Sequence, residues 1–347
     1  MIDRSNMHIY TIIACNCWAQ THVFAQGTAK WQKSEGKMPM NSKFLLYTLK
    51  RLGMAILTIF LVIAITFFVM HAIPASPFSS EKAKSDETIA ALEAKYGFDK
   101  PVPVQFVNYL KNILQGDFGL STKWIGSTVS DLIVGGLSYS VQLGLTAASI
   151  AIVLGVLLGA LAALNRGKLL DKIIQVVTTA LVSMPNFVIA TLLLIIFALN
   201  LKWFPTMATQ ENGMILPSLS LALYPMSYIT RLERSAMLDV LGQDYIRTAR
   251  AKGLKNNKVI FKHALKNALG PVITYAGPMM AYILTGSMVV ENIFSVPGLG
   301  RLFVNSMLRT DYMMIMGVTI VLATAIIVMN FLADVLYKVM DPRINLS

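Results

Sequence analysis

Charged residues are scarce in this chain, which argues against an ordinary soluble domain. Only 14% of the 347 residues are Asp, Glu, Lys or Arg, whereas 55% are apolar. Several apolar runs come close to the roughly 20 residues that an α-helix needs to cross a bilayer. The composition therefore predicts an all-α integral membrane protein that crosses the cell membrane several times.

Cysteine is nearly absent as well. The chain has two cysteines, Cys15 and Cys17, and both lie in its first forty residues. This leaves no disulfide framework for the body of the chain and too few ligands for a metal site. We expect the chain to bind no metal and no cofactor of its own.

The sequence also lacks the motifs of self-contained catalysis. A P-loop needs GxxxxGK followed by Ser or Thr, but the Gly-Lys pairs at Gly36 and Gly167 continue into Met and Leu. There is no HExxH zinc motif, no GxSxG nucleophile motif and no paired His cluster. We predict that the chain is not an enzyme and that energy for its work comes from elsewhere.

Ionisable residues within the apolar runs are few. They are Glu291, Asp334 and His71, and each lies near the end of its run. A proton or ion relay would need such groups nearer the bilayer midplane. We predict snorkelling or a local hydrogen bond for these three residues, which disfavours transport driven by an ion gradient.

The apolar runs predict six membrane spans. These are residues 51–73, 138–164, 173–199, 214–230, 272–293 and 313–337. Pro185 is expected to kink or break the third span because proline lacks the N–H that the helix needs. Gly155 and Gly159 in the second span form a small-xxx-small pair, which favours close packing against a helix that the sequence does not identify. Residues 75–137 are expected to form an external subdomain.

The distribution of Lys and Arg sets the predicted orientation. The short segments predicted to lie outside hold only Lys202, Arg301 and Arg309, whereas basic residues crowd the segments predicted to lie inside. Basic residues flank spans on the cytoplasmic side, so both termini are predicted to be cytoplasmic. Topology and contact with membrane lipid therefore explain the net charge of +12, and nucleic-acid binding is not needed.

Residues 1–39 differ in kind from the rest. They hold both cysteines and, among other residues, Trp18 and Trp31, without a sustained apolar run. We expect the functional chain to begin near Met40, with the earlier segment either a disordered tail or an artefact of start-site choice. Residues 40–347 are then predicted to form one transmembrane domain.

Residues 231–270 form the most basic segment and are expected to be a cytoplasmic loop. Its second half predicts a helix capped by Asn257, with lysines recurring every four residues on one face. The apolar face of this helix is predicted to comprise Ile260, Phe261, Ala264, Leu265 and Ala268. A basic loop that lies against anionic lipid headgroups remains an alternative for the whole segment.

The first half of this loop predicts a shorter helix, residues 245–252. Asp244 is expected to cap its start and Gly253 to end it with a positive φ. About two turns of helix are too short to be stable alone, so the helix needs support from its flanks or from a partner. Ala249 and Ala251 would keep it thin enough to enter a cleft on another protein.

DYIRTARAKGL (244–254) resembles the coupling motif in permease subunits of ATP-binding-cassette importers, specifically the first permease of the oligopeptide and dipeptide systems. Arg247, Thr248 and Ala249 stand where the wider superfamily has Glu-Ala-Ala. Further segments also resemble that branch: GDFG with Ser121, VSMPNF, RLERSAMLDVL, HALKNALGPVIT, VVENIFSVPGLGR and YKVMDPRI. The resemblance covers about residues 43–345. One departure is IPASPF after the first span, where the branch usually has Pro-Gly-Asp-Pro.

The resemblance implies a type I importer fold and a set of partners. These are a second permease, two cytoplasmic ATP-binding subunits that use ATP, and an external substrate-binding protein. The external loop 75–137 and the VPGLGR segment would meet the binding protein, and the substrate-binding residues stay unassigned. The implied contacts with the ATP-binding subunits are Asp244, Tyr245, Arg247, Thr248, Ala249, Arg250, Ala251, Lys252 and Gly253.

The expected function is thus the ATP-driven import of oligopeptides or dipeptides. A permease for nickel, glutathione or another small solute is an alternative, because the permease motifs follow coupling rather than cargo. A secondary transporter would show internal repeats and midplane charges, and a membrane-anchored sensor would carry a signalling domain. Neither set of features is found in the sequence.

Overall fold

A computed structural model describes residues 42–72, 99–124, 126–284 and 287–340. Residues from Lys50 onward belong to one compact unit, and residues 42–49 are the first turns of α2. The predicted tail 1–39 and much of the predicted external loop lie outside the described residues. The regular secondary structure in the described part of the chain is helical, apart from one isolated bridge between Leu120 and Thr128.

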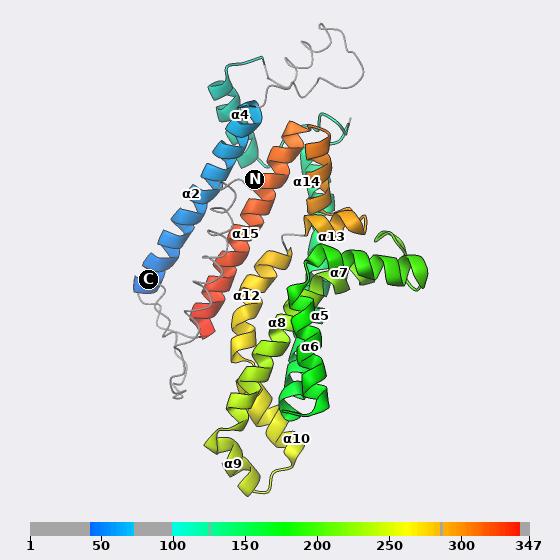
Figure 1. Cartoon of the computed structure of the whole chain (residues 1–347). Helices are drawn as coiled ribbons and strands as arrows, with labels where there is room; N and C mark the ends of the chain where they lie inside the picture. Colours follow the sequence, from blue (N-terminus) through cyan, green and yellow to red (C-terminus); the bar gives the residue numbers. More distant parts are fainter. Residues whose placement is uncertain (1–41, 73–98, 125, 285–286, 341–347) are drawn as a thin grey trace, which may run out of the picture. The chain divides into compact units, whose positions relative to one another are not determined.

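Figure 1 shows the described helices, coloured in the order of the chain. In order they are α2 (Ser42–Ala72), α4 (Val102–Leu114), α5 (Val129–Leu164), α6 (Leu169–Ser183), α7 (Asn186–Leu193), η3 (Leu194–Asn200), α8 (Ile215–Leu241), α9 (Asp244–Ala251), α10 (Asn256–Lys258), η4 (Val259–Leu265), α11 (Lys266–Ala268), α12 (Gly270–Leu284), α13 (Met288–Ile293), α14 (Leu299–Leu308) and α15 (Tyr312–Met340). The two η elements are π-helical turns within longer helical stretches.

Three described helices are long and apolar enough to cross a membrane, namely α2, α5 and α15. A fourth crossing results if α6 and residues 186–200 count as one span, although this pair is bent by 108°. Met184 and Pro185 are both extended at the bend, with ψ of 135° and 140°. Pro185 therefore breaks the helix, as predicted, whereas the count of six spans and the side of each terminus stay predictions.

Several predicted helix boundaries are wrong. Helix α5 begins at Val129 rather than at residue 138, because Thr128 Oγ1 accepts a hydrogen bond from the Asp131 N–H (3.0 Å) and caps it. Helix α8 continues past Thr230 to Leu241, so the predicted loop 231–270 begins as helix. The predicted fifth span, 272–293, is divided between α12 and the separate helix α13.

The central packing unit is the pair α5 and α8, with α12 against both (Figure 1). A Cβ at Gly155 would lie 2.7 Å from Ile229 Cγ2, and one at Gly159 would lie 2.6 Å from the Thr230 carbonyl oxygen. Only glycine permits this approach, so α8 is the partner of the predicted small-xxx-small pair.

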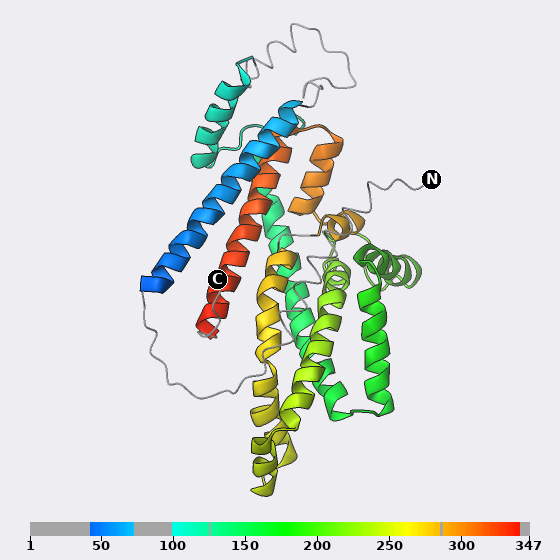
Figure 2. The ribbon, with the colours of Figure 1, turned by 60° about the vertical axis from the view of Figure 1, so that its left-hand side comes forward.

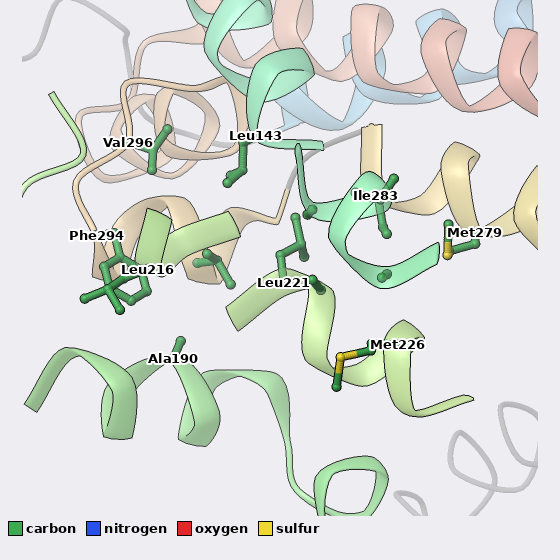
Figure 3. Packing of buried hydrophobic residues seen from close by; sticks show 14 of the residues in the cluster. Leu143, Ala190, Leu216, Leu221, Met226, Met279, Ile283, Phe294 and Val296 are labelled. Atoms are coloured by element: carbon green, nitrogen blue, oxygen red, sulfur yellow. The ribbon is translucent and has the colours of Figure 1, made fainter. Parts of the chain in front are cut away.

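A buried apolar cluster joins this pair to the neighbouring helices. Figure 3 shows side chains from α5, α7, α8 and α12 converging with those of the segment that follows α13. The labelled members are Leu143, Ala190, Leu216, Leu221, Met226, Met279, Ile283, Phe294 and Val296. These contacts hold both broken and continuous helices in one packed body.

Local hydrogen bonds account for two of the three ionisable residues in the apolar runs. His71 Nε2 lies 2.9 Å from Gln105 Oε1 on α4. The fully buried Glu291 carboxylate accepts hydrogen bonds from Ser140 Oγ (2.8 Å) and from the Arg301 N–H (3.0 Å). The predicted local role is confirmed for both, whereas the side chain of Asp334 lies outside the described residues.

Candidate functional site at the end of helix α8

The short helix predicted in the basic segment is α9, and its start differs slightly from the prediction. The chain leaves α8 at Gly242 and is extended at Gln243, with φ of −75° and ψ of 150°. Gln243 therefore occupies the N-cap, and Asp244 is the first helical residue rather than the cap. A carboxylate in the first turn still interacts favourably with the positive end of the helix dipole.

The end of α9 agrees with the prediction. Gly253 has φ of +71°, and its N–H donates to the Arg250 carbonyl oxygen (2.9 Å). A Cβ at Gly253 would meet nothing within 4 Å. Backbone conformation alone, and not lack of space, therefore requires glycine at this stop.

One face of α9 is buried against its own chain. Ile246 is fully buried and Ala249 is 8% exposed. Both belong to an apolar cluster with Met237 of α8, Val259 and Ala264 of η4, and neighbouring side chains. The flanking helices thus supply the support that so short a helix needs.

The opposite face of α9 is exposed and basic. Its exposed residues are Asp244, Tyr245, Arg247, Thr248, Arg250, Ala251 and Lys252, followed by Gly253. Arg247 Nη1 lies 3.6 Å from Asp244 Oδ1, but these side chains are 76% and 96% exposed, so the ion pair adds little stability. The Tyr245 hydroxyl accepts a hydrogen bond from Asn267 Nδ2 (3.0 Å), which ties α9 to α11.

Of the nine residues predicted as contacts, eight are therefore brought together on one exposed surface, and Ala249 is not among them. Ala249 instead packs against η4 and its neighbours within the buried cluster. Its small side chain allows α9 to lie close to the flanking helix.

The second helical stretch of the segment, 256–268, also departs from the prediction. Lys255, and not Asn257, precedes its first turn. Its buried residues are Val259, Ile260, Ala264 and Ala268, whereas Phe261 is 63% exposed. The π-helical turns of η4 explain the difference, because their i→i+5 hydrogen bonds rotate the side chains away from the register of an α-helix.

An ion pair that sequence reasoning missed joins the C-terminal half of α8 to α6. The Asp171 carboxylate is 2% exposed and accepts hydrogen bonds from Arg234 Nε (2.7 Å) and Nη2 (2.9 Å). It also accepts from the Gly167 N–H and from Gln175 Nε2, each at 2.9 Å. Such a bidentate, fully hydrogen-bonded pair orients both helices.

Glu233, the neighbour of Arg234, was also missed, and its side chain is fully buried. Its Cβ lies where α8 meets Gly159 of α5. Neither carboxylate oxygen has a hydrogen-bond partner within the described part of the chain. A buried polar group without partners is costly, so this residue opposes the close α5–α8 packing around it.

Comparison with known proteins decides what kind of protein carries this site. Residues 155–346 match the family model of the binding-protein-dependent transport system inner membrane component. Residues 43–126 match the model of the N-terminal part of such membrane components. The chain belongs to this family. Its members are membrane components of transport systems, and the site at the end of α8 lies within the matched region.

Named relatives cover most of the chain. Over 301 residues the chain is 46% identical to the dipeptide transport system permease protein DppB of Bacillus subtilis. This alignment covers 86% of this chain and 98% of that protein. It is 44% identical over 304 residues to the oligopeptide transport system permease protein OppB of Haemophilus influenzae, over 86% of this chain and 99% of that protein. The Escherichia coli K12 OppB is 42% identical over 302 residues, with the same coverage.

A solved structure shares the fold. The MetNI methionine ABC transporter in inward-facing conformations contains a chain that aligns with a TM-score of 0.50 at 17% identity. The alignment covers 60% of this chain and 95% of that chain. Over the aligned part, this chain therefore shares its fold with a chain of that transporter.

Proposed function

We propose that this chain is a permease subunit of an ATP-driven importer for oligopeptides or dipeptides. The observation that carries the proposal is the 42–46% identity to dipeptide and oligopeptide permeases over nearly their whole length. The alignments cover 86% of this chain and 98–99% of each of these relatives. The proposal therefore concerns the whole permease and not one shared motif.

Helix α9 is proposed as the element that meets an ATP-binding partner. It projects from the end of α8, is held by its own flanking helices and keeps a basic face exposed. A helix supported in this way transmits a push or pull to α8 without unfolding. Ala249 supports the position of α9, and the exposed residues, Arg247 foremost, make the contact. ATP is bound and hydrolysed by the partners, and this chain binds no cofactor.

The proposed assembly contains a second permease, two ATP-binding subunits and an external substrate-binding protein. This chain would cross the cytoplasmic membrane six times with both termini inside. Helix α14 and the loop before it are proposed to face the binding protein. Two hydrogen bonds fix their position: Ser140 Oγ accepts from the Leu299 N–H (2.9 Å), and the Glu291 carboxylate accepts from the Arg301 N–H.

Co-purification of the native complex tests this proposal. Affinity capture of this chain from gently solubilised membranes is expected to bring down a second permease and ATP-binding subunits in a 1:1:2 ratio. Capture of this chain alone, with ion-driven uptake in its presence, would instead support a secondary transporter.

A further inference from the structure

Helix α8 carries a continuous polar stripe on its exposed side. Tyr224, Tyr228, Arg231, Ser235 and Asp239 recur at intervals of three and four residues, so they lie on one face. Each of these positions is exposed or half-exposed, whereas the residues on either side of the stripe are mostly buried.

Helix α12 carries a second stripe beside the first. Tyr275 is half-exposed and Tyr282 is 70% exposed, seven residues apart on one helical face. The Tyr228 and Tyr275 rings lie 4.4 Å apart between centroids, which joins the stripes of α8 and α12. The two helices run next to each other in Figure 2. Four tyrosines therefore share one surface.

These tyrosines extend along the helices instead of forming one layer. Tyr228 precedes Ile229, which touches α5 at Gly155, and Tyr282 precedes Ile283, which touches α5 at Gly144. At 1.5 Å per residue, those levels on α5 are roughly 16 Å apart. The aromatic belt of a membrane protein lies at the lipid–water interface, and a series that runs so far along the helix axis does not match a belt.

Some of the exposed surface at this depth is apolar. On α5, for example, Val153, Leu154 and Leu157 are 56%, 40% and 49% exposed. Hydrocarbon tails tolerate such side chains, whereas burying a phenol hydroxyl in hydrocarbon costs free energy unless a polar group satisfies it. The contrast between this apolar face of α5 and the tyrosine surface indicates that the former meets lipid and the latter meets water or polar solute.

We propose that Tyr224, Tyr228, Tyr275 and Tyr282 line the aqueous route of the transported solute and contact the peptide directly. A tyrosine hydroxyl both donates and accepts hydrogen bonds, which matches backbone amides of any sequence. The rings offer apolar area to varied side chains at low entropic cost. The four phenol side chains carry no charge, which suits an extended peptide more than a metal ion. The peptide part of this inference rests on the proposed function.

Thiol accessibility in the complete importer tests the route. The chain has two native cysteines, Cys15 and Cys17, which are first replaced by serine. Tyr228→Cys is then compared with Val153→Cys, because Val153 lies at a similar depth on the exposed apolar face of α5. The reconstituted complex is treated with a charged, membrane-impermeant methanethiosulfonate, with and without ATP, and modification of this chain is measured by mass spectrometry.

We expect Tyr228→Cys to be modified in at least one nucleotide state, Val153→Cys to be unmodified in both, and peptide-loaded binding protein to slow the modification. Tyr228→Phe keeps the ring, and loss of one hydrogen bond is expected to raise the KM for peptide uptake roughly three- to tenfold. The inference would be overturned if Tyr228→Cys did not react with the reagent in either nucleotide state, or if it formed an oxidative cross-link to the second permease. The proposed function would stand in that case, provided that the importer without the substitution still took up peptide. Modification in an importer that takes up no peptide would count against the proposed cargo instead.

Discussion

At Gly253 a single dihedral angle ends the helix that we propose to meet the ATP-binding partner. Its φ of +71° is accessible to glycine and strained for a β-branched residue. We expect Gly253→Val to leave membrane assembly intact and to abolish ATP-driven uptake. Gly253→Ala should give an intermediate rate of uptake, because the left-handed conformation costs alanine about 1–2 kcal/mol. Uptake by membrane vesicles measures this.

Gly242→Ala is the matched control. Gly242 lies just before α9 with φ of −80°, and a Cβ there would be 3.5 Å from its closest neighbour, the Asp239 carbonyl oxygen. Both values are ordinary for alanine. Normal uptake by Gly253→Val, or equal losses in both glycine variants, would refute the assignment of α9 as the coupling element.

Glu233 should reduce stability in its present setting. Because neither carboxylate oxygen has a partner in the described residues, Glu233→Met is expected to raise the free energy of unfolding by about 1–3 kcal/mol. The measurement is thermal denaturation of the purified permease complex. Glu211→Met, at an exposed loop position, is the control and should change stability by less than about 0.5 kcal/mol. A loss of stability in Glu233→Met would mean that the carboxyl group has a partner.

Replacing Asp171 should instead lower the stability of the fold, because Asp171 is paired with Arg234. Asp171→Asn leaves the Arg234 guanidinium without its bidentate acceptor, and we expect a loss of about 2–4 kcal/mol, since Arg234 is 22% exposed and partly screened. The double variant Asp171→Asn/Arg234→Met should recover much of that loss. Additive losses in the double variant would contradict a direct interaction.

Some of these features could be predicted from the amino-acid sequence, and others could not. The stop at Gly253 could be read from the sequence, because a glycine that follows an Ala- and Arg-rich stretch fits a C-terminal cap. The burial of Glu233 could not, since a glutamate between Arg231 and Arg234 resembles a solvated loop. Its environment depends on Gly159 of α5, which is distant in sequence.

At the scale of elements, α9 combines an exposed basic face with a buried apolar one. Reversing one charge on the exposed face should weaken coupling and leave the buried face intact. We expect Arg247→Glu to lower peptide uptake at least about fivefold, the lower end of typical coupling energies. Lys258→Glu places the same charge change at an exposed position of α10 and should have a smaller effect. Equal effects would indicate a general attraction to lipid or protein instead of a contact at α9.

The order of elements was largely predictable, and their boundaries were not. Pro185 marked a break because proline cannot continue the hydrogen-bonded ladder. The start of α5 was missed, since Ser130 and Asp131 interrupt the apolar run in its first turn although Thr128 caps it. The end of α8 was missed because its last turns are polar yet pack against α6 and η4. A local cap sets the start of α5, whereas tertiary contacts set the end of α8.

For the whole molecule, the family could be inferred from motifs and agrees with the comparisons. The glycine pair of α5 was recognised as a packing motif, but its partner α8 became evident only in the structure. The tyrosine surface of α8 and α12 was not predicted, because its members come from two segments that are far apart in sequence. Proximity of that kind is a property of the folded chain.

The central claim is that this chain carries peptides inward at the expense of ATP used by its partners. The most direct measurement is the accumulation of a labelled peptide in vesicles that contain the complete importer, with the binding protein outside. We predict ATP-dependent accumulation that an unlabelled peptide competes away and that is lost when this chain carries Gly253→Val. Accumulation of nickel or glutathione without any peptide uptake, or peptide uptake that persists without ATP, would contradict the account.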